Sequence, residues 1–245
     1  MSYRMSHQQA GYAQFYDETI FGGYAGHLWE TVERPLLETL LSQVPVREGV
    51  ALDFACGTGR ITAVVAKRFP QVIGVDVAEE MLRRARTRCP TVTFLCGDLT
   101  RELLLPPGSV ELVTAFRFFQ NAEPELREEV LSVFRRVLRP GGTVILNVQC
   151  NADGPAGLVQ RFRRRVLGRS HLRVMTIQEV RELLGRHGFR IERVEWYGFW
   201  PRTGRHLPGL AARMQRPMEF VVRLLRLPPR RCAQMFMVSA VLEAP

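Results

Sequence analysis

The sequence predicts an α/β fold in which helices cover both faces of a doubly wound sheet of seven, mostly parallel, strands. Short apolar runs alternate with longer segments whose apolar residues recur at helical spacing. The first run, residues 50–54, leads through a glycine-containing turn into a helix. Two further runs each end in an acidic residue, Asp76 and Asp98. Because ligands gather at the carboxyl ends of parallel strands, these strand ends predict one shared ligand site.

The core elements follow one another along the chain. Pro90 ends the second core helix, Arg139-Pro140-Gly141-Gly142 ends the third with a sharp turn, and a capping box at 176–179 opens a fourth helix. The last two strands are expected to form an antiparallel hairpin at the sheet edge. The expected strands are 50–54, 72–76, 92–96, 110–116, 143–148, 189–199 and 233–242, and the expected helices are 59–69, 78–88, 125–138 and 176–187.

The strand ends describe a particular kind of ligand. Glycines in the first turn, Gly57 and Gly59, permit positive φ angles and let a ligand approach the main chain. Asp76 is suited to bidentate hydrogen bonds to a ribose diol, and Asp98 can accept from an exocyclic amine such as that of adenine. The sequence has neither a phosphate-binding Gly-x-x-x-x-Gly-Lys-[Ser/Thr] loop nor a full Gly-x-Gly-x-x-Gly series. The pattern therefore predicts an adenosine-like cofactor without a diphosphate.

Four motifs carry a family resemblance. They are Leu-Asp-Phe-Ala-Cys-Gly-Thr-Gly-Arg at 52–60, Gly-Val-Asp-Val-Ala-Glu-Glu-Met-Leu at 74–82, Cys-Gly-Asp-Leu at 96–99 and Val-Leu-Arg-Pro-Gly-Gly at 137–142. In order and spacing, over residues 45–150, they resemble the class I S-adenosylmethionine-dependent methyltransferases, whose fold is Rossmann-like. Ala55 stands where that family has its first glycine, and alanine still lets the methionine part of the cofactor approach.

The resemblance implies S-adenosyl-L-methionine as the cofactor and S-adenosyl-L-homocysteine as the product. It also implies cofactor contacts from the first three strand ends, from an apolar side chain against the adenine face, and from the end of the fourth strand. The residues concerned are Asp53, Ala55, Cys56, Gly57, Gly59, Asp76, Val77, Met81, Gly97, Asp98, Leu99 and Phe116. We interpret Cys56 as a small turn residue and not as a nucleophile.

The acceptor is expected near the end of the fourth strand, at Phe116-Arg117-Phe118-Phe119. Nucleic-acid amine methyltransferases usually carry [Asp/Asn/Ser]-Pro-Pro-[Tyr/Phe/Trp] there to hold a flipped base, and this chain does not. Arg117 could neutralise a carboxylate on the substrate or cofactor, or form a salt bridge within the fold. After the fifth strand, Gln149 and Asn151 could orient a polar acceptor or satisfy a loop.

Segments outside the core are expected to cover the site. In the family that the motifs resemble, the segment before the first core strand lies across the cofactor mouth, so residues 1–45 are predicted to be a helical lid on a methyltransferase domain at 46–245. Tyr16, Tyr24, His27 and Arg34 are candidates for the substrate or cofactor cavity, although aromatic packing and surface charge are the more common explanation for such residues. Pro35 predicts a kink or break in the lid.

Two insertions interrupt the second half of the domain, at about 152–175 and 200–232. The first contains an arginine-rich helix at 158–167, and the second a helix at about 218–227. Because long insertions in compact domains are often functional lids, the second is predicted to cap the acceptor pocket together with the N-terminal segment. A basic amphipathic helix of this kind could also rest on an anionic membrane.

Composition excludes several classes of protein. The 245 residues contain five scattered cysteines without a Cys-x-x-Cys pair, which argues for reduced thiols, against a disulfide scaffold and against a zinc site; no metal is expected. No apolar run approaches the ~20 residues of a transmembrane helix. The N-terminus has no signal-peptide apolar core. We therefore expect a cytoplasmic protein.

Charge is divided unevenly between the halves of the chain. Residues 1–150 contain 16 basic and 17 acidic residues, whereas residues 151–245 contain 18 basic and 7 acidic residues. A basic half suggests an acidic partner, which could be nucleic acid, an anionic membrane or an anionic substrate. A solvated basic surface without any partner is an equal alternative.

These patterns lead to three functional hypotheses. The first is a methyltransferase that transfers a methyl group to a small-molecule or lipid-like acceptor by in-line displacement. The second is an RNA methyltransferase that uses the basic C-terminal half. The third is a non-catalytic protein that keeps the fold for interaction. No residue identifies itself as catalytic, although His27, His171 and His206 are candidate bases by location.

Overall fold

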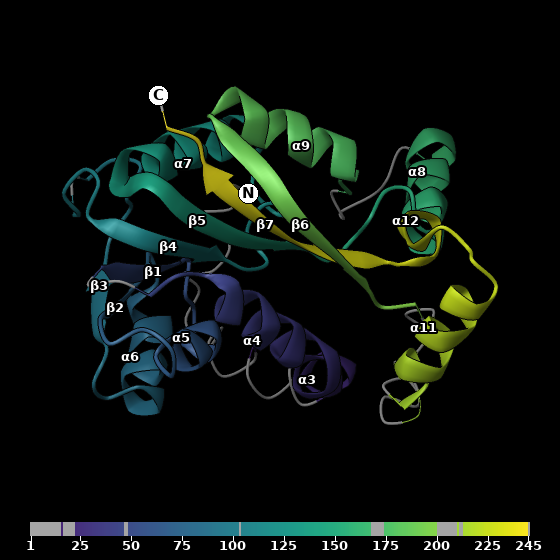
Figure 1. Cartoon of the computed structure of the whole chain (residues 1–245), viewed down its shortest axis with the longest axis horizontal. Coiled ribbons are helices and arrows are strands. Elements are labelled where there is room, and N and C mark those ends of the chain that lie inside the picture. The colour runs from purple at the N-terminus through teal and green to yellow at the C-terminus, as the bar shows by residue number, and fades with distance from the viewer. Residues whose placement is uncertain are drawn as a thin grey trace.

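A computed structural model of the chain confirms the expected α/β fold (Figure 1). It describes residues 16, 23–46, 49–102, 104–167, 174–199, 210 and 213–244, except for the side chains of Tyr24, Arg164 and Leu167. Seven strands form one sheet in the order β3-β2-β1-β4-β5-β7-β6. Their bounds are β1 Val50–Phe54, β2 Val72–Asp76, β3 Thr93–Cys96, β4 Val110–Ala115, β5 Leu138–Val148, β6 Phe189–Tyr197 and β7 Met235–Leu242.

The pairing of these strands agrees with the sequence. β1 lies parallel to β2 and to β4, and the parallel pairing continues to β3 on one side and to β5 on the other. β7 runs antiparallel to both β5 and β6, so that β6 and β7 form the predicted antiparallel pair at the edge. The strand order reverses between β1 and β4, which is where ligands bind in open sheets of this kind.

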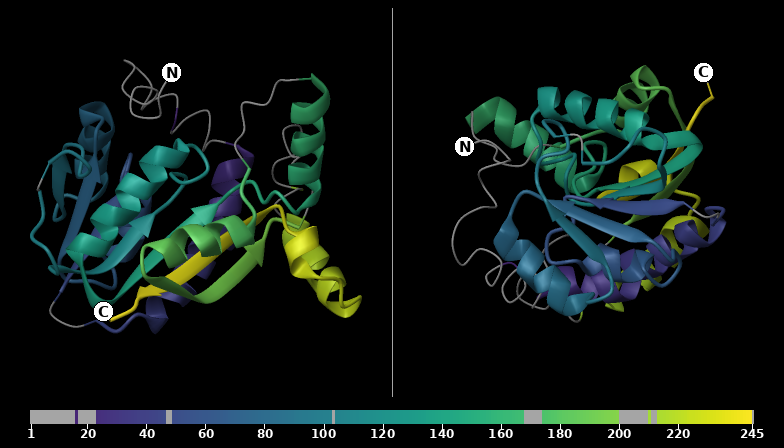
Figure 2. Two further views of the ribbon diagram at one scale, coloured as in Figure 1. Left: turned by 90° about the horizontal axis from the view of Figure 1, so that it is seen from above. Right: turned by 90° about the vertical axis from the view of Figure 1, so that its left-hand side faces the viewer.

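Helices cover both faces of the sheet, as Figure 2 shows from above and from the side. One face carries α4 (Arg34–Gln43), α5 (Arg60–Val65) and α6 (Glu79–Arg88), and the other carries α7 (Pro124–Val137) and α9 (Ile177–Arg186). Successive strand residues point to opposite faces. Accordingly, Leu52 lies in the core under α7 and α9, and its neighbour Ala51 lies in the core under α4 and α5.

The helical segment before β1 continues past Pro35 without a break. α3 (Tyr24–Leu28) continues into η2 (Trp29–Glu33), a single π-helical stretch, and α4 begins at Arg34 with the proline as its second residue. The backbone stays helical at Glu33 and Arg34, and Arg34 N donates to the carbonyl oxygen of Trp29, so the change from α- to π-helical bonding next to the proline takes the place of the predicted break. The π-helical stretch turns two of its side chains, Trp29 and Glu33, into the protein interior.

Two local features in the second half of the chain can be compared with the sequence predictions: a helix start and a strand start. Thr176 and Glu179 form the predicted capping box, with Glu179 N donating to Thr176 Oγ1 at 3.0 Å and Thr176 N donating to Glu179 Oε2 at 2.6 Å. β5 begins at Leu138, five residues before the expected strand at 143. Val110 pairs with Leu138, but Leu112 already pairs with Thr143, so the Arg-Pro-Gly-Gly segment is an outward bulge within the strand.

Three helices lie together at one end of the molecule, on the right in Figure 1. They are α8 (Pro155–Leu167), α11 (Gln215–Leu224) and the short α12 (Pro229–Cys232). They belong to the two predicted insertions, of which residues 168–173, 200–209, 211 and 212 lie outside the described part. None of the helices that the structure describes is long and apolar enough to span a bilayer.

Candidate active site

The turn after β1 has the backbone that the sequence predicts. Ala55, Gly57 and Gly59 adopt φ angles of 53°, 55° and 76°. A Cβ added to Gly57 would meet nothing within 4 Å, so this glycine leaves open space beside the main chain. A Cβ on Gly59 would lie 3.1 Å from the Cα of Ala85, so this glycine lets α5 pack closely on α6. The two glycines therefore have different functions, and only Gly57 faces a ligand site.

Asp53, near the end of β1, is a buried carboxylate held by two hydroxyl groups. Thr62 Oγ1 donates to Asp53 Oδ2 at 2.5 Å, and Thr114 Oγ1 donates to Asp53 Oδ1 at 2.8 Å. Burial raises the pKa of Asp53 from 3.8 to about 6, although these hydroxyl groups oppose the shift. The neighbouring Cys56 is buried as well, and burial followed by the charge of Asp76 raises the pKa of its thiol. A thiol held neutral in this way agrees with our interpretation of Cys56 as a small turn residue.

Asp76, at the end of β2, is oriented by backbone donors. Gly57 N donates to Asp76 Oδ2 at 2.8 Å, and Ala78 N donates to Asp76 Oδ1 at 2.9 Å. These bonds connect the second strand end to the glycine turn of the first. The side chain is half-buried, so these bonds fix the carboxylate at the strand end. Its contact with a ribose diol stays a prediction.

The third strand end is more closely packed than the sequence suggests. Asp98 Oδ1 accepts from Thr100 N at 3.0 Å and from Thr100 Oγ1 at 2.7 Å, while Oδ2 lies 3.7 Å from Arg101 Nε. The side chain of Leu99 is buried in the main core. Met81 is buried against Ala78 and Tyr16. Val77, directly after β2, and Gly97, directly after β3, are half-buried. Adenine contacts for this group stay a prediction.

A pocket opens at the carboxyl ends of β1 and β4. The space within it is about 450 Å³, part of which is continuous with solvent. Its walls come from the glycine turn, the start of α5, the end of β4 and the N-terminal segment. The lining residues are Tyr16, Trp29, Glu33, Asp53, Ala55, Cys56, Gly57, Thr58, Arg60, Ile61, Phe116 and Arg117.

Arg117 is the most constrained residue of the pocket. Its φ angle is 60°, which is unusual for a residue other than glycine. Its backbone N donates to Asn147 Oδ1 at 2.6 Å, and its Nη2 lies 3.3 Å from Glu33 Oε2. Burial lowers the pKa of Arg117, but the charges of Tyr16 and Glu33 outweigh burial and raise it. The guanidinium is therefore a permanent positive charge in the pocket wall.

Glu33 connects Arg117 to the far edge of the sheet. Its side chain is 1% exposed, and its Oε1 accepts from Tyr197 Oη at 2.9 Å. Asn147 Nδ2 donates to the same tyrosine oxygen at 3.3 Å. Burial, and then the charge of Glu33, raise the pKa of Tyr197 well above its usual value, so this hydroxyl stays a donor. In one of its two amide orientations, Gln149 also accepts from Arg117 Nε at 2.9 Å.

The pocket brings together seven of the predicted site residues, and five of its lining residues were not predicted. The seven are Tyr16, Asp53, Ala55, Cys56, Gly57, Phe116 and Arg117; the five are Trp29, Glu33, Thr58, Arg60 and Ile61. A signal for Thr58, Arg60 and Ile61 was available, because they continue directly from the glycine turn. Trp29 and Glu33 come from the π-helical stretch, which the sequence pattern did not distinguish from an ordinary amphipathic helix.

The remaining candidates lie elsewhere. His27 is exposed, and its Nδ1 lies 3.3 Å from the carbonyl oxygen of Gly23, so it does not line the pocket. The side chain of Tyr24 and all of His171 and His206 lie outside the described residues. Asn151 satisfies a loop, because its Nδ2 donates to the carbonyl oxygens of residues 230 and 233 at 2.7 and 2.8 Å. Among the described residues of the later insertion, none lines the pocket, so its capping role stays a prediction.

Comparison with known proteins decides the family. Residues 51–142, which contain the glycine turn and the first four strands, match the family model described as a methyltransferase domain. The chain contains a class I methyltransferase domain. This confirms the predicted family, whose cofactor is S-adenosyl-L-methionine.

Curated relatives extend the similarity beyond the matched domain. The chain is 35% identical over 161 residues to a trans-aconitate 2-methyltransferase of Rhizobium meliloti (strain 1021), covering 63% of this chain and 54% of the relative. A trans-aconitate 2-methyltransferase of Sinorhizobium fredii (strain NBRC 101917 / NGR234) is 32% identical over 163 residues, covering 64% of this chain and 55% of the relative. The matched part thus spans about half the length of these curated relatives.

Solved structures show the same fold. An S-adenosylmethionine-dependent methyltransferase from Methanosarcina mazei superposes with a TM-score of 0.62 at 17% identity, covering 84% of this chain and 98% of the other. Another from Mesorhizobium loti gives a TM-score of 0.57 at 22% identity, covering 89% of this chain and all of the other (100%). The methyltransferase domain of this chain is therefore Rossmann-like, as the motifs predict.

Proposed function

We propose that this chain is an S-adenosylmethionine-dependent methyltransferase whose acceptor is a small molecule bearing at least one carboxylate. The observation that supports this most directly is the guanidinium of Arg117, whose side chain is 16% exposed, in the wall of a small pocket beside the glycine turn. The curated relatives support it as well, because they are named for methylating trans-aconitate, a small tricarboxylate.

The residues at the strand ends fit the cofactor. Gly57 leaves open space beside the main chain, Asp76 presents a carboxylate suited to a ribose diol, and Asp53 supplies negative charge beneath the turn. Bound there, S-adenosylmethionine would supply a methyl group already activated on a sulfonium. These residues bind and orient the cofactor, and positioning accounts for a large part of catalysis in a displacement of this kind.

Arg117 is placed to hold an anionic acceptor. A guanidinium binds a carboxylate through two parallel hydrogen bonds, which fixes orientation as well as charge. Glu33 fixes the guanidinium from one side, with an Nη2–Oε2 distance of 3.3 Å. Since a carboxylate acceptor is ionised at neutral pH, it needs no general base, and one bound carboxylate would leave another free to accept the methyl group.

The N-terminal segment completes the pocket. Trp29 is 4% exposed, and with Tyr16 and Phe116 it forms apolar and aromatic wall beside the charged groups. Such a wall limits the volume of the acceptor and excludes water, which strengthens the attraction between Arg117 and an anion. A lid formed by residues 1–45 is part of this proposal.

The first test is calorimetric titration of the full chain with S-adenosylhomocysteine. Micromolar or tighter binding is expected, and no binding would contradict the cofactor assignment. The acceptor is then sought by mass spectrometry of reactions with trans-aconitate, other small di- and tricarboxylates, neutral lipid-like compounds and RNA. Methylation restricted to lipid-like compounds or RNA would contradict the carboxylate proposal.

A conservative variant tests the function of Arg117. Arg117→Lys keeps the positive charge but loses the bidentate geometry, so KM for the carboxylate should rise about tenfold, with S-adenosylhomocysteine affinity unchanged. Arg181→Lys, on the exposed face of α9, is the matched control and should change neither quantity. An unchanged KM in Arg117→Lys would show that the acceptor lies elsewhere.

A further inference from the structure

Exposed large hydrophobic side chains are confined to one region of the described chain. All ten of them lie on α8 or between residues 210 and 227. Scattered single apolar residues are normal on a protein surface, but a concentration in one place indicates an interaction site. The ten are Leu158, Val159, Phe162, Val166, Leu210, Phe220, Val221, Leu224, Leu225 and Leu227.

The apolar residues of α8 face solvent because of how the helix packs. Leu158, Phe162 and Val166 recur every four residues and so form one stripe along the helix. They are 55%, 66% and 60% exposed. The first turn of α8 is against the protein, where a Cβ on Gly157 would lie only 2.0 Å from the carbonyl oxygen of Asn151, whereas Arg161, Arg163 and Arg165 are exposed together with the stripe. The apolar stripe therefore lacks the contact with the core that such a stripe usually makes.

α11 is arranged in the same way. Its buried side carries Gln215 and Val222, and Val222 packs with Phe199 in a small cluster. Phe220 and Leu224, one helical turn apart, are 65% and 66% exposed on the other side. The outward apolar stripes of α8 and α11 are called here the apolar faces.

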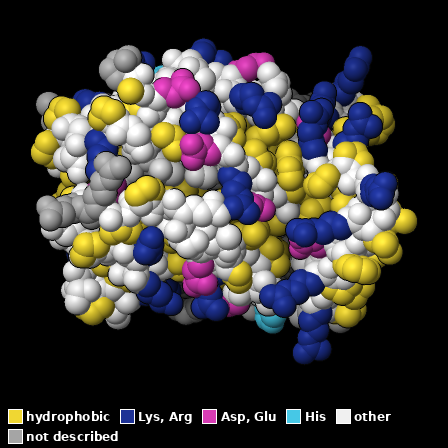
Figure 3. All heavy atoms as spheres, viewed as in Figure 1, with side chains coloured by type: hydrophobic (Ala, Val, Ile, Leu, Met, Phe, Trp, Pro, Cys, Tyr) yellow, Lys and Arg dark blue, Asp and Glu magenta, His cyan; other side chains and the backbone are white. Residues whose placement is uncertain are grey.

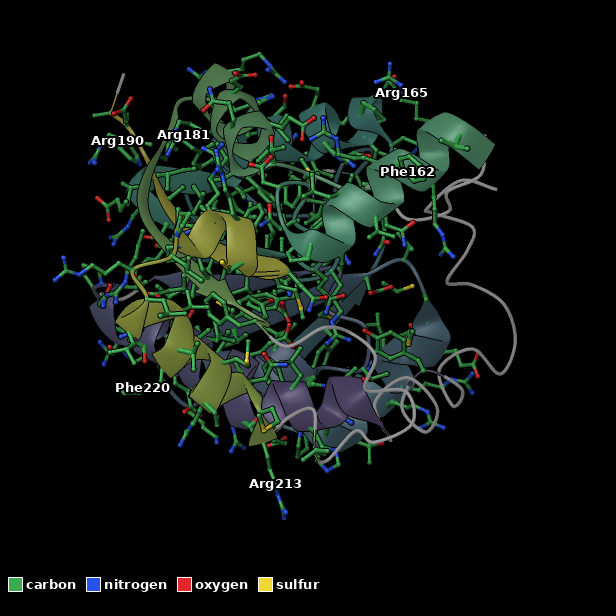
Figure 4. The ribbon with its side chains drawn as sticks, turned by 90° about the vertical axis from the view of Figure 1, so that its right-hand side faces the viewer. Phe162, Arg165, Arg181, Arg190, Arg213 and Phe220 are labelled. Carbon is green, nitrogen blue, oxygen red and sulfur yellow. The ribbon has the colours of Figure 1, made fainter. Side chains whose placement is uncertain are left out.

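α12 holds the two helices at the same end of the molecule. Arg230 Nε, on α12, lies 3.2 Å from Oδ2 of Asp153, which immediately precedes α8. α11 leads into α12 through residues 225–228. Figures 1 and 2 show all three helices at one end, and Figure 4, which looks onto that end, shows Phe162 on α8 and Phe220 on α11. The apolar faces therefore lie at one end of the molecule, with Phe162 and Phe220 at opposite corners of that end in Figure 4.

Basic residues accompany the apolar faces. α8 contains Arg161, Arg163, Arg164 and Arg165 and no acidic residue. Between residues 213 and 232 there are six arginines and a single acidic residue, Glu219. Figure 3 shows the resulting mixture of basic and hydrophobic side chains at this end. By helical position, Arg161 and Arg165 flank the stripe of α8 on one side and Arg163 on the other.

We propose that α8 and α11 dock on the anionic headgroup surface of a lipid membrane, with their apolar faces at the headgroup–acyl boundary. Helices with an apolar stripe flanked by arginine lie in the plane of such a surface, because the stripe is buried while the guanidinium groups reach the phosphates. A second copy of the chain fits this surface poorly, since two positive surfaces would be opposed. RNA would satisfy the arginines but would leave the apolar faces uncovered.

The test is flotation of the full chain with lipid vesicles. Vesicles of phosphatidylcholine alone are compared with vesicles that also contain phosphatidylglycerol, each at low and at high salt. Binding is expected only to the anionic vesicles, with partial loss at high salt because charge attraction is screened and apolar burial is not. Absence of binding to anionic vesicles at low salt would overturn the proposal.

Matched variants separate the apolar and the charged contributions. The paired variant Phe162→Gln/Phe220→Gln should lower vesicle binding at least tenfold, as should Arg161→Gln/Arg165→Gln. The control Arg181→Gln/Arg190→Gln removes the same charge from α9 and β6, away from α8 and α11, and should bind like the unchanged chain. Equal losses in both arginine pairs, or no loss in the phenylalanine pair, would mean unspecific charge attraction and would overturn the proposal.

A spectroscopic measurement reports insertion directly. Phe162→Trp places an indole on the apolar face of α8, and its emission should shift to the blue and be quenched by acyl-brominated lipids. Arg181→Trp is the control and should show neither change. A vesicle-independent dimer that Phe220→Gln dissociates, or RNA binding that the phenylalanine pair weakens, would assign this surface to a different occupant.

Discussion

Replacing Asp53 by asparagine gives a quantitative test of the pocket. Burial raises the pKa of this carboxyl from 3.8 to about 6 in the folded protein. The difference of about 2 units between the two pKa values corresponds to a free energy of about 3 kcal/mol. Below pH 3.8 the group is protonated in both states, so the folded state keeps this stability in full. As the pH rises towards 6, the unfolded chain ionises first, and the stability is lost.

An amide cannot ionise, so Asp53→Asn removes this dependence. The free energy of unfolding of the variant, minus that of the unchanged protein, should increase by about 3 kcal/mol between about pH 3 and about pH 7. Urea unfolding at a series of pH values, followed by tryptophan fluorescence, measures this difference. Other titrating groups, such as Glu128, contribute equally to both proteins and cancel. Thr114→Val removes a hydroxyl that lowers the pKa and should steepen the dependence. A difference constant to ~0.5 kcal/mol would refute the burial argument.

Three further predictions concern the strand ends. Asp76→Ala should weaken S-adenosylhomocysteine binding by roughly 1 to 3 kcal/mol in calorimetry, because a carboxylate acceptor of the ribose is lost; unchanged affinity would show that the ribose lies elsewhere. Arg117→Met leaves Glu33 buried without this cation and should destabilise the protein by about 3 to 5 kcal/mol in urea unfolding, and adding Glu33→Gln should restore much of the loss. Both glycines have positive φ angles, so Gly57→Val and Gly59→Val should each lower the melting temperature, and Gly59→Val should lower it further through its clash with α6; Gly57→Val alone should also weaken cofactor binding, and unchanged cofactor affinity in Gly57→Val would contradict its assignment.

The sequence predicted the cofactor side of the site because its information is local. The glycine turn, with Asp53 before it and Asp76 at the next strand end, falls within 24 consecutive residues whose order specifies strand, turn and helix. The mostly parallel sheet and the antiparallel pair of β6 and β7 followed from the same alternation of apolar runs. Boundaries were less accurate where a strand and a turn overlap, as at β5, because periodicity does not report a bulge.

The acceptor side was harder to predict because its contacts are distant in sequence. Glu33 and Tyr197 are 164 residues apart, and no pattern of apolar residues indicates that a polar pair will meet in the interior. Arg117 was recognised as a candidate either for a contact with a substrate or cofactor carboxylate or for a salt bridge within the fold. The sequence did not decide between the two because Glu33, the partner in the salt bridge, is distant in sequence. The structure shows that the salt bridge within the fold exists, which leaves the carboxylate contact as an additional function and not as an alternative.

The position of Glu33 also links the N-terminal segment to acceptor recognition. Glu33 belongs to η2, which precedes the sheet, whereas the guanidinium that it holds follows β4. The same π-helical stretch supplies Trp29 to the pocket wall. A segment outside the matched methyltransferase domain at 51–142 therefore orients the charge of Arg117 and forms part of the pocket wall. The glycine turn and Asp76 lie within that domain and Glu33 lies outside it, so, if the proposed function holds, changes in the N-terminal segment should alter acceptor specificity while cofactor binding is preserved.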